Sequence, residues 1–177
     1  IMPVSLAWIL ALIARLLVTG CLHEDGLADF FDGFGGGTTR ERTLAIMKDS
    51  HIGSYGVIGL ICYFLLLFQL HHLPLGLLCI LVLSGDCWSK FCASQIVNYL
   101  PYARKEEDSK SKTVYNRMSW HELLAGFLCG LLPFVLLLPI KLWIATLFPL
   151  LTFFLLYRLM KRRLQGYTGD CCGDTFP

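Results

Sequence analysis

The chain is built largely from long apolar runs separated by short charged segments, and this pattern limits the possible folds more than any other feature. Each run is close to the ~20 residues that a helix needs to cross a bilayer. The pattern predicts an all-α, polytopic membrane helix bundle with about five spans. The predicted spans are residues 4–18, 55–70, 73–102, 123–140 and 142–157.

The composition agrees with burial in lipid. The chain is 55% hydrophobic and only 16% charged, whereas soluble domains average about 25% charged residues. We expect residues 1–177 to form a single integral membrane domain. The chain begins at Ile1 without an initiator Met and ends at Pro177 inside a motif, so we expect native residues to be missing at both ends. The eight cysteines contain no CxxC pair and are expected to be small apolar residues.

Two of the runs leave their internal structure open. The third run carries Asp86 and Lys90 in its middle, which predicts either one broken helix or two short pieces. The fourth and fifth runs are separated only by Lys141, beside Pro139, so they predict a tight hairpin or one kinked, partly re-entrant element.

The distribution of Lys and Arg predicts the orientation. With five spans, the three basic segments fall on one side of the membrane: residues 20–53, residues 101–119 and the tail from Arg158. The turns at His71 and Lys141 fall on the other side and are nearly bare of Lys and Arg. Positive segments stay in the cytoplasm, so we expect a multi-pass protein of the cell (inner) membrane with its active site facing the cytoplasm. The net charge of +2 is too small to indicate a nucleic-acid partner.

The most informative stretch, residues 19–56, opens with an acidic cluster. Asp25, Asp29 and Asp32 are spaced i, i+4, i+7, which places them on one helical face, with Glu24 pointing away. Carboxylates stacked in this way repel one another unless a cation joins them. Hard oxygen ligands suit Mg²⁺ or Mn²⁺ better than Zn²⁺. The pattern favours a metal site, although a solvated acidic helix face would have the same spacing.

Several neighbours of this cluster suit phosphate chemistry. Four glycines follow it at positions 33, 35, 36 and 37 and predict either a phosphate-binding loop or a flexible turn. Thr38 and Glu41 form a possible capping box for a helix that carries three cations. A helix N-terminus with two arginines attracts anions, although ordinary positive-inside charge explains the arginines equally well. These cations are Arg40, Arg42 and Lys48.

Three further side chains complete the candidate set from the residues alone. His23 could be a metal ligand, a general base or a polar group at the membrane interface. Asp49 and His51 end the predicted helix near Gly53 and could return toward the acidic cluster. Carboxylate-held metal beside glycines and arginines is the equipment of phosphoryl transfer.

The same stretch resembles the signature of a known family. Its two halves, TGCLHEDGLADFFDGFGGG and RERTLAIMKDSHIGSYG, are similar to the cobalamin synthase (adenosylcobinamide-GDP ribazoletransferase) pattern TGGLHxDGLADxxDGxGGG followed by RERxLxIMKDSxIGxYG. LPYAR at 100–104 and TGD at 168–170 resemble two further segments of that family. The departures from the pattern are Cys21, Glu24, Lys90 and Asp174.

The resemblance implies a Mg²⁺-dependent membrane phosphotransferase of vitamin B12 biosynthesis. It would join adenosylcobinamide-GDP to α-ribazole or its 5′-phosphate and release GMP. The protein could also form a homo-oligomer. Asp25, Asp29 and Asp32 would be the metal ligands, and His23 or Asp49 would be the catalytic base. The resemblance implies that phosphate and substrate are bound by Gly35, Gly36, Arg40, Arg42, Lys48, Arg104 and Asp170.

Two alternatives belong to other classes of function. A membrane phosphotransferase of the CDP-alcohol type also places spaced aspartates at a helix end, but with a different spacing. A transporter or channel would use the three aspartates as a cation site near the middle of the membrane, whereas here they lie at the end of a predicted span.

Overall fold

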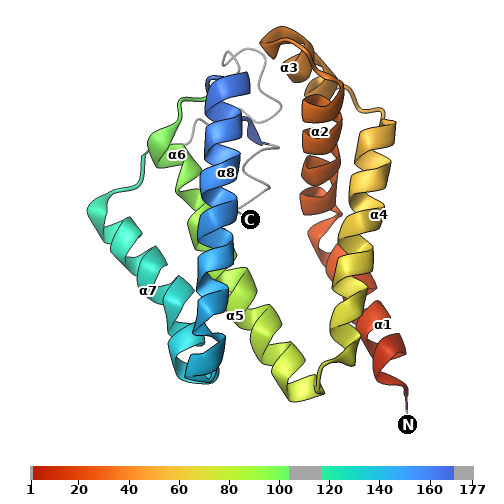
Figure 1. Cartoon of the computed structure of the whole chain (residues 1–177), viewed down its shortest axis with the longest axis vertical. Coiled ribbons are helices and arrows are strands. Elements are labelled where there is room, and N and C mark those ends of the chain that lie inside the picture. The colour runs from red at the N-terminus through yellow and green to blue at the C-terminus, as the bar shows by residue number, and fades with distance from the viewer. Residues whose placement is uncertain (1, 104–116, 170–177) are drawn as a thin grey trace. The chain divides into compact units, whose positions relative to one another are not determined.

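The computed structural model describes residues 2–103 and 117–169, and these residues are helical apart from turns and one isolated bridge. The chain divides into two compact units, one formed by Ile1–Leu78 with the residues from Gly169 onward, and the other by Cys79–Thr168. Figure 1 labels the elements, which are α1 (Val4–Thr19), α2 (Leu22–Gly36), α3 (Arg40–Lys48), α4 (Ser54–Gln69), η1 (Leu70–His72), α5 (Leu75–Ser94), α6 (Ile96–Tyr99), α7 (Trp120–Leu137), η3 (Ile140–Thr146) and α8 (Leu147–Arg163).

The predicted all-α membrane bundle is confirmed. Within the described residues, four helical segments are long and apolar enough to cross a membrane: Ser54–His72, Leu75–Tyr99, Trp120–Leu137 and Ile140–Arg163. Helices α1 and α2 pass the same test only as a pair, bent by 87°, and bring the number of spans to as many as five. Helix α1 matches the first predicted run, residues 4–18, but reaches the length of a span only together with α2, which continues at a sharp angle.

The bend between α1 and α2 has a local cause. Gly20 (φ 62°) and Cys21 (φ 59°) both adopt the left-handed conformation. The backbone N–H of Cys21 donates to the Leu16 carbonyl at 3.0 Å and so closes α1. Left-handed residues of this kind commonly end helices, and here the chain enters α2 directly afterwards.

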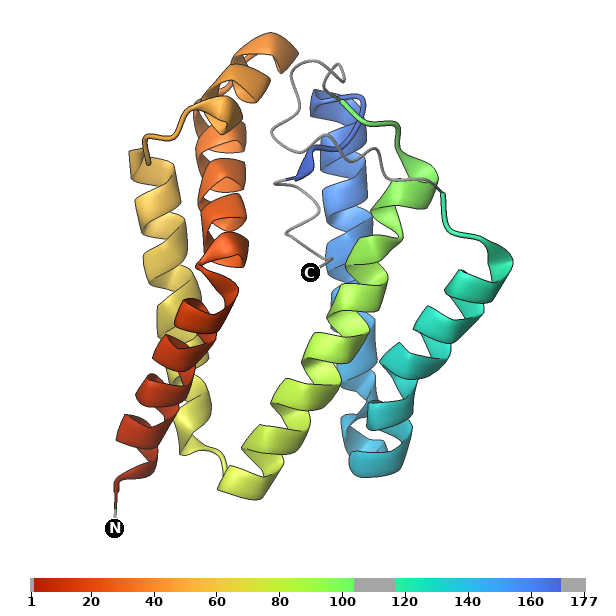
Figure 2. The ribbon, with the colours of Figure 1, turned by 180° about the vertical axis from the view of Figure 1, so that it is seen from behind.

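In the first unit, α2 and α4 lie side by side and run in opposite directions (Figures 1 and 2). Glycines of α4 allow the close approach. A Cβ atom at Gly59 would overlap the ring of Phe31, and one at Gly56 would lie 3.1 Å from the Ala28 carbonyl oxygen. Small residues at such contacts let helices pack closely in a membrane, where apolar surface alone gives little drive for association.

In the second unit, α5 passes without interruption through the charged residues of the third run. Asp86 and Lys90 lie inside α5, and the helix breaks only at Gln95, before α6. The spacing i, i+4 between an acid and a base is compatible with a continuous helix. The break expected around residues 86–90 therefore lies at a later point of the chain.

The fourth and fifth runs form a tight hairpin. Helix α7 leads into the 3₁₀ segment η3, and α8 then runs back in the opposite direction (Figure 1). Two tryptophans hold this turn through main-chain acceptors. Trp88 Nε1 donates to the Thr146 carbonyl at 2.9 Å, and Trp143 Nε1 donates to the Leu138 carbonyl at 3.2 Å. Pro139, at the start of η3, stops the continuation of α7.

We predict that Gly59→Ala destabilises the α2–α4 pair. The added methyl group must displace the ring of Phe31, and overpacking of this kind costs about 1–3 kcal/mol. Gly85→Ala is the control, since nothing lies within 4 Å of its ideal Cβ position and Ala favours the helix. Thermal unfolding in detergent micelles measures both, and equal melting temperatures for the two variants would contradict the proposed packing.

Candidate active site

The acidic cluster lies on one helix, as predicted, but its three aspartates have different surroundings. Asp25, Asp29 and Asp32 all belong to α2. Asp25 is exposed, Asp29 is partly buried, and Asp32 is only 7% exposed. The buried member therefore has a different environment from the other two.

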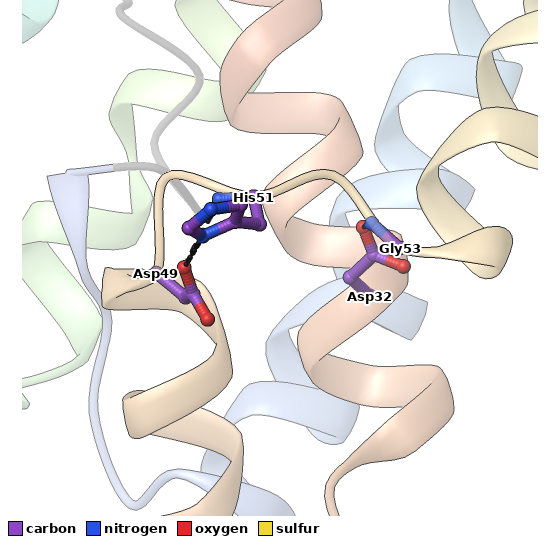
Figure 3. A network of polar contacts seen from close by, with 4 residues as sticks. All are labelled: Asp32, Asp49, His51 and Gly53. Carbon is purple, nitrogen blue, oxygen red and sulfur yellow. Dashed lines mark hydrogen bonds and ion pairs between the residues drawn. The ribbon is translucent and has the colours of Figure 1, made fainter.

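Asp32 is bonded to the start of α4. Its Oδ2 accepts the Gly53 N–H at 2.7 Å, and Figure 3 shows these two residues side by side. Its Oδ1 accepts the Gly56 N–H at 2.8 Å. Gly53 is the N-cap of α4 and offers no side chain of its own. Because the first N–H groups of a helix lack partners within it, a carboxylate there satisfies them and favours the helix dipole. Asp32 thus caps α4 from a neighbouring helix.

The two glycines of this contact are required by space. An ideal Cβ atom at Gly53 would lie 2.5 Å from Asp32 Oδ1, and one at Gly56 would overlap Asp32 Oδ2. The Gly-x-x-Gly spacing at the start of α4 is therefore explained by the carboxylate that lies against it.

The metal prediction remains a prediction. Among the described residues, no group of three or more His, Cys, Asp or Glu side chains is gathered so as to hold a metal ion. Both oxygens of Asp32 already accept backbone N–H groups. Asp25 and Asp29 remain one helical turn apart on the same face, which is a two-carboxylate arrangement.

The glycine-rich segment is part of a helix. Helix α2 continues through Gly35 and Gly36, and Gly37 is its C-cap, so the predicted loop does not form. Packing explains the glycines: a Cβ at Gly33 would overlap Met47 of α3, and one at Gly35 would lie 2.5 Å from the Tyr55 ring. Phosphate binding by Gly35 and Gly36 stays a prediction.

Helix α3 begins one residue later than predicted. Its N-cap is Thr39, whose Oγ1 accepts the Arg42 N–H at 3.2 Å, and not Thr38. Arg40 and Arg42 lie in the first turn and Lys48 in the last turn. Arg42 and Lys48 are exposed and Arg40 is partly buried.

Asp49 and His51 form a bonded pair after α3. Asp49 Oδ1 accepts the His51 backbone N–H at 3.0 Å and lies 2.6 Å from His51 Nδ1 (Figure 3). These hydrogen bonds hold the pKa of the Asp49 carboxyl below its ordinary value, and the guanidinium of Arg42 lowers it further. A carboxylate with a lowered pKa is a weaker proton acceptor, so the pairing with His51 makes Asp49 a weaker candidate for the catalytic base.

A surface pocket of about 340 Å³ gathers part of the predicted set. Asp32, Gly36, Arg42 and Asp49 line it, together with His51 and Tyr55. The pocket thus joins the end of α2, the arginine helix α3 and the start of α4. His23, Asp25, Asp29, Gly35, Arg40 and Lys48 are not among its lining residues. His23 lies in the first turn of α2 and is partly buried.

Two predicted residues, Arg104 and Asp170, lie outside the described residues. The segments that lead to them are bonded to each other within the second unit. The Ala103 N–H donates to the Tyr167 carbonyl at 2.7 Å, and the Tyr167 N–H donates to the Pro101 carbonyl at 2.9 Å.

Glu24 is a residue whose burial was not expected from the sequence. It is only 5% exposed, and its Oε2 has no hydrogen-bond partner among the described residues. The sequence did contain a signal for this burial: Glu24 lies one helical turn before Ala28 and so on the same face of α2, and Ala28 is buried against α4. An unpaired buried carboxylate oxygen is costly, so Glu24 does not contribute to stability through that atom.

The fold and this site define a class of protein: a multi-pass α-helical membrane protein whose acidic helix adjoins an arginine-bearing helix. The sequence matches the model of the cobalamin-5-phosphate synthase family over residues 1–176. The chain therefore belongs to this family.

Curated relatives agree with this assignment. One from Shewanella amazonensis, named adenosylcobinamide-GDP ribazoletransferase, is 44% identical over 188 residues, covering 98% of this chain and 68% of the relative. Relatives of the same name from Shewanella frigidimarina and Vibrio parahaemolyticus are each 38% identical, over 98% of this chain and 68% and 66% of their own lengths. No solved structure matches.

We predict that Asp32→Ala destabilises the first unit by about 2–4 kcal/mol, because two N–H groups at the start of α4 lose a charged acceptor. Asp25→Ala, on the exposed side of the same helix, should change stability by less than about 0.5 kcal/mol. Thermal unfolding in nanodiscs compares them. A stable Asp32→Ala variant would show that the contact does not hold α4.

We also predict that His51→Ala raises the pKa of Asp49 toward the ordinary value of about 3.9. Because the folded-state pKa is lowered, the contribution of this pair to stability is present above the ordinary carboxyl pKa and is lost as the pH falls through the lowered value. Carboxyl ¹³C chemical shifts measure the titration. His72→Ala, in η1, is the control, and an unchanged Asp49 titration in His51→Ala would refute the pairing.

Proposed function

We propose that this protein catalyses the reaction for which its relatives are named, the transfer of the cobinamide-phosphate group of adenosylcobinamide-GDP to α-ribazole or its 5′-phosphate. The observation that carries the proposal is the 44% identity to a ribazoletransferase over 98% of the chain. The acidic helix α2 can hold a metal ion and the cationic helix α3 can bind phosphate, and a diphosphate substrate requires both.

The reaction exchanges one phosphorus–oxygen bond for another. A ribose hydroxyl other than that at the 5′ position, which is esterified in the 5′-phosphate, attacks the phosphorus that carries cobinamide, and its proton passes to a base. The bond from this phosphorus to the bridging oxygen of the diphosphate breaks, and GMP leaves with the negative charge. The protein must bring this hydroxyl to the anionic diphosphate and stabilise the charge that develops on the leaving oxygen.

We assign the metal site to Asp25 and Asp29 together with the diphosphate of the substrate. Mg²⁺ in proteins is commonly held by one or two carboxylates plus substrate phosphates, so a cage of three protein ligands is not required. When bound, Mg²⁺ neutralises phosphate charge and orients the leaving group. Asp32 is not assigned as a ligand. Its role is structural, because its two hydrogen bonds fix the start of α4 against α2, the helix that carries the proposed ligands.

Cationic side chains of α3 are assigned to phosphate. Arg42 lines the pocket next to Gly36, and its guanidinium can bind phosphate through two parallel hydrogen bonds. Arg40 and Lys48, on the same helix, add positive charge. Arg104 and Asp170 stay candidates for phosphate and substrate binding from the sequence resemblance alone.

We favour His23 over Asp49 as the proton acceptor. The pairing with His51 lowers the pKa of Asp49 and weakens it as a base. His23 precedes Asp25 by two residues in the first turn of α2, so it is close in sequence to the proposed metal ligands. Asp49 then serves to hold the loop between α3 and α4.

We further propose that the site faces the cytoplasm from the cell inner membrane. The basic segments 37–53, 101–119 and 158–163 would share that side if all five spans, the bent α1–α2 pair included, cross the bilayer. Nucleotide-linked substrates are then supplied from the side on which they are made.

We predict that Asp25→Asn and Asp29→Asn each lower the transferase rate by at least about a hundredfold, since each removes a charged metal ligand. Reconstituted protein is assayed for GMP release from adenosylcobinamide-GDP and α-ribazole, with chelator and with added Mg²⁺. Glu41→Gln, an exposed acid in the first turn of α3, is the control and should keep its activity. Full activity in both aspartate variants, or activity that survives chelation, would refute the metal assignment.

A further inference from the structure

The end of α8 carries a face on which two aromatic rings are followed by two cations. Phe154, Tyr157, Arg158 and Lys161 are spaced i, i+3, i+4 and i+7, which places them on one side of the helix. The Arg158 guanidinium lies 4.4 Å from the centre of the Phe154 ring. The Lys161 ammonium lies 5.5 Å from the centre of the Tyr157 ring and donates to its hydroxyl at 3.2 Å. These contacts hold two cations against rings.

The surface of α8 changes character along its length. Its earlier part exposes large apolar side chains, among them Phe148, Leu151 and Leu155. The aromatic residues follow, and the exposed cations Arg158, Lys161 and Arg162 come last. Apolar, aromatic and cationic side chains in this order match the hydrocarbon, interfacial and phosphate layers of one bilayer leaflet.

The charge of this segment is of one sign. Residues 140–169 contain no Asp or Glu, so the cations of α8 have no acidic residue within their own segment. They also lie at the C-terminal end of the helix, where the dipole favours cations. The arrangement leaves exposed positive charge at the end of the candidate span Ile140–Arg163.

We infer that the end of α8, from Phe154 to Arg162, is a binding surface for anionic phospholipid headgroups. The lipid phosphate lies against Arg158, Lys161 and Arg162, and its acyl chains lie along the apolar surface of Leu151 and Leu155. The rings of Phe154 and Tyr157 hold the first two cations in place at the interface.

The occupant is a bilayer lipid and not a soluble phosphate because the cationic end continues directly into exposed apolar surface. Phe154 and Leu155 are 47% and 57% exposed, and a water-soluble anion would leave that surface uncovered. A phospholipid covers the apolar and the cationic parts together. This inference does not depend on the transferase reaction.

The experiment measures lipid selectivity. Purified protein is reconstituted in phosphatidylcholine nanodiscs, and electron paramagnetic resonance gives the association constant of spin-labelled phosphatidylglycerol relative to spin-labelled phosphatidylcholine. We expect wild type to prefer phosphatidylglycerol. Lys161→Gln should lower this preference by up to about fivefold, since each cation near an anionic surface is worth about that factor. The triple variant Arg158→Gln, Lys161→Gln, Arg162→Gln should abolish it.

Two controls decide the origin of the effect. Lys141→Gln removes one charge at the other end of the same candidate span, Ile140–Arg163, and should leave the preference unchanged. Arg158→Lys with Arg162→Lys keeps the charge and should keep most of the preference. The inference is overturned if wild type shows no preference, if the triple variant retains it, if Lys141→Gln acts as strongly as Lys161→Gln, or if soluble diphosphate displaces the labelled lipid.

Discussion

The first unit depends on one contact, the carboxylate of Asp32 against the start of α4. Two short hydrogen bonds, of 2.7 and 2.8 Å, join the C-terminal part of α2 to the backbone of Gly53 and Gly56. The contact fixes where α4 begins, and hence where the loop after α3 must end. The pocket that contains Arg42 and Asp49 is a consequence of this position, since its walls come from α2, α3 and the start of α4.

This contact divides the acidic cluster into two roles. A spacing of i, i+4, i+7 says that three carboxylates share a face, but it does not say that they share a ligand. Burial separates them: Asp32 is enclosed and bonded to backbone, whereas Asp25 is exposed. The electrostatic cost of three adjacent carboxylates is therefore reduced in two ways, by helix N–H groups for Asp32 and, in the proposed function, by a cation for the others. One acidic helix can then both support the fold and bind substrate.

The parts of the fold that could be predicted are those set by local pattern. Apolar length identified the spans, and the i, i+4 spacing placed the aspartates on one helix. The errors arose where tertiary contacts override local preference. Four glycines predict a loop, yet α2 continues through Gly36. Two of the glycines, at positions 33 and 35, are explained by Met47 and Tyr55, which pack where side chains would otherwise lie. The bend after Gly20 could not be predicted either, since left-handed Cys21 has no sequence signal.

In the second unit, too, hydrogen bonds to the backbone join two segments that are far apart in the chain. The segments before Arg104 and Asp170 are more than sixty residues apart in the chain, and two backbone hydrogen bonds through Tyr167 hold them together. Gly166 is needed there, since an ideal Cβ atom would lie 2.6 Å from the Pro101 carbonyl oxygen. Tyr167 and Thr168 are almost fully buried, so the contact is part of the core of the unit. Backbone bonds of this kind do not depend on which side chain occupies most positions. They therefore fix Pro101 and Ala103 against Tyr167 whatever their side chains are, whereas the start of α4 depends on one side chain, the carboxylate of Asp32.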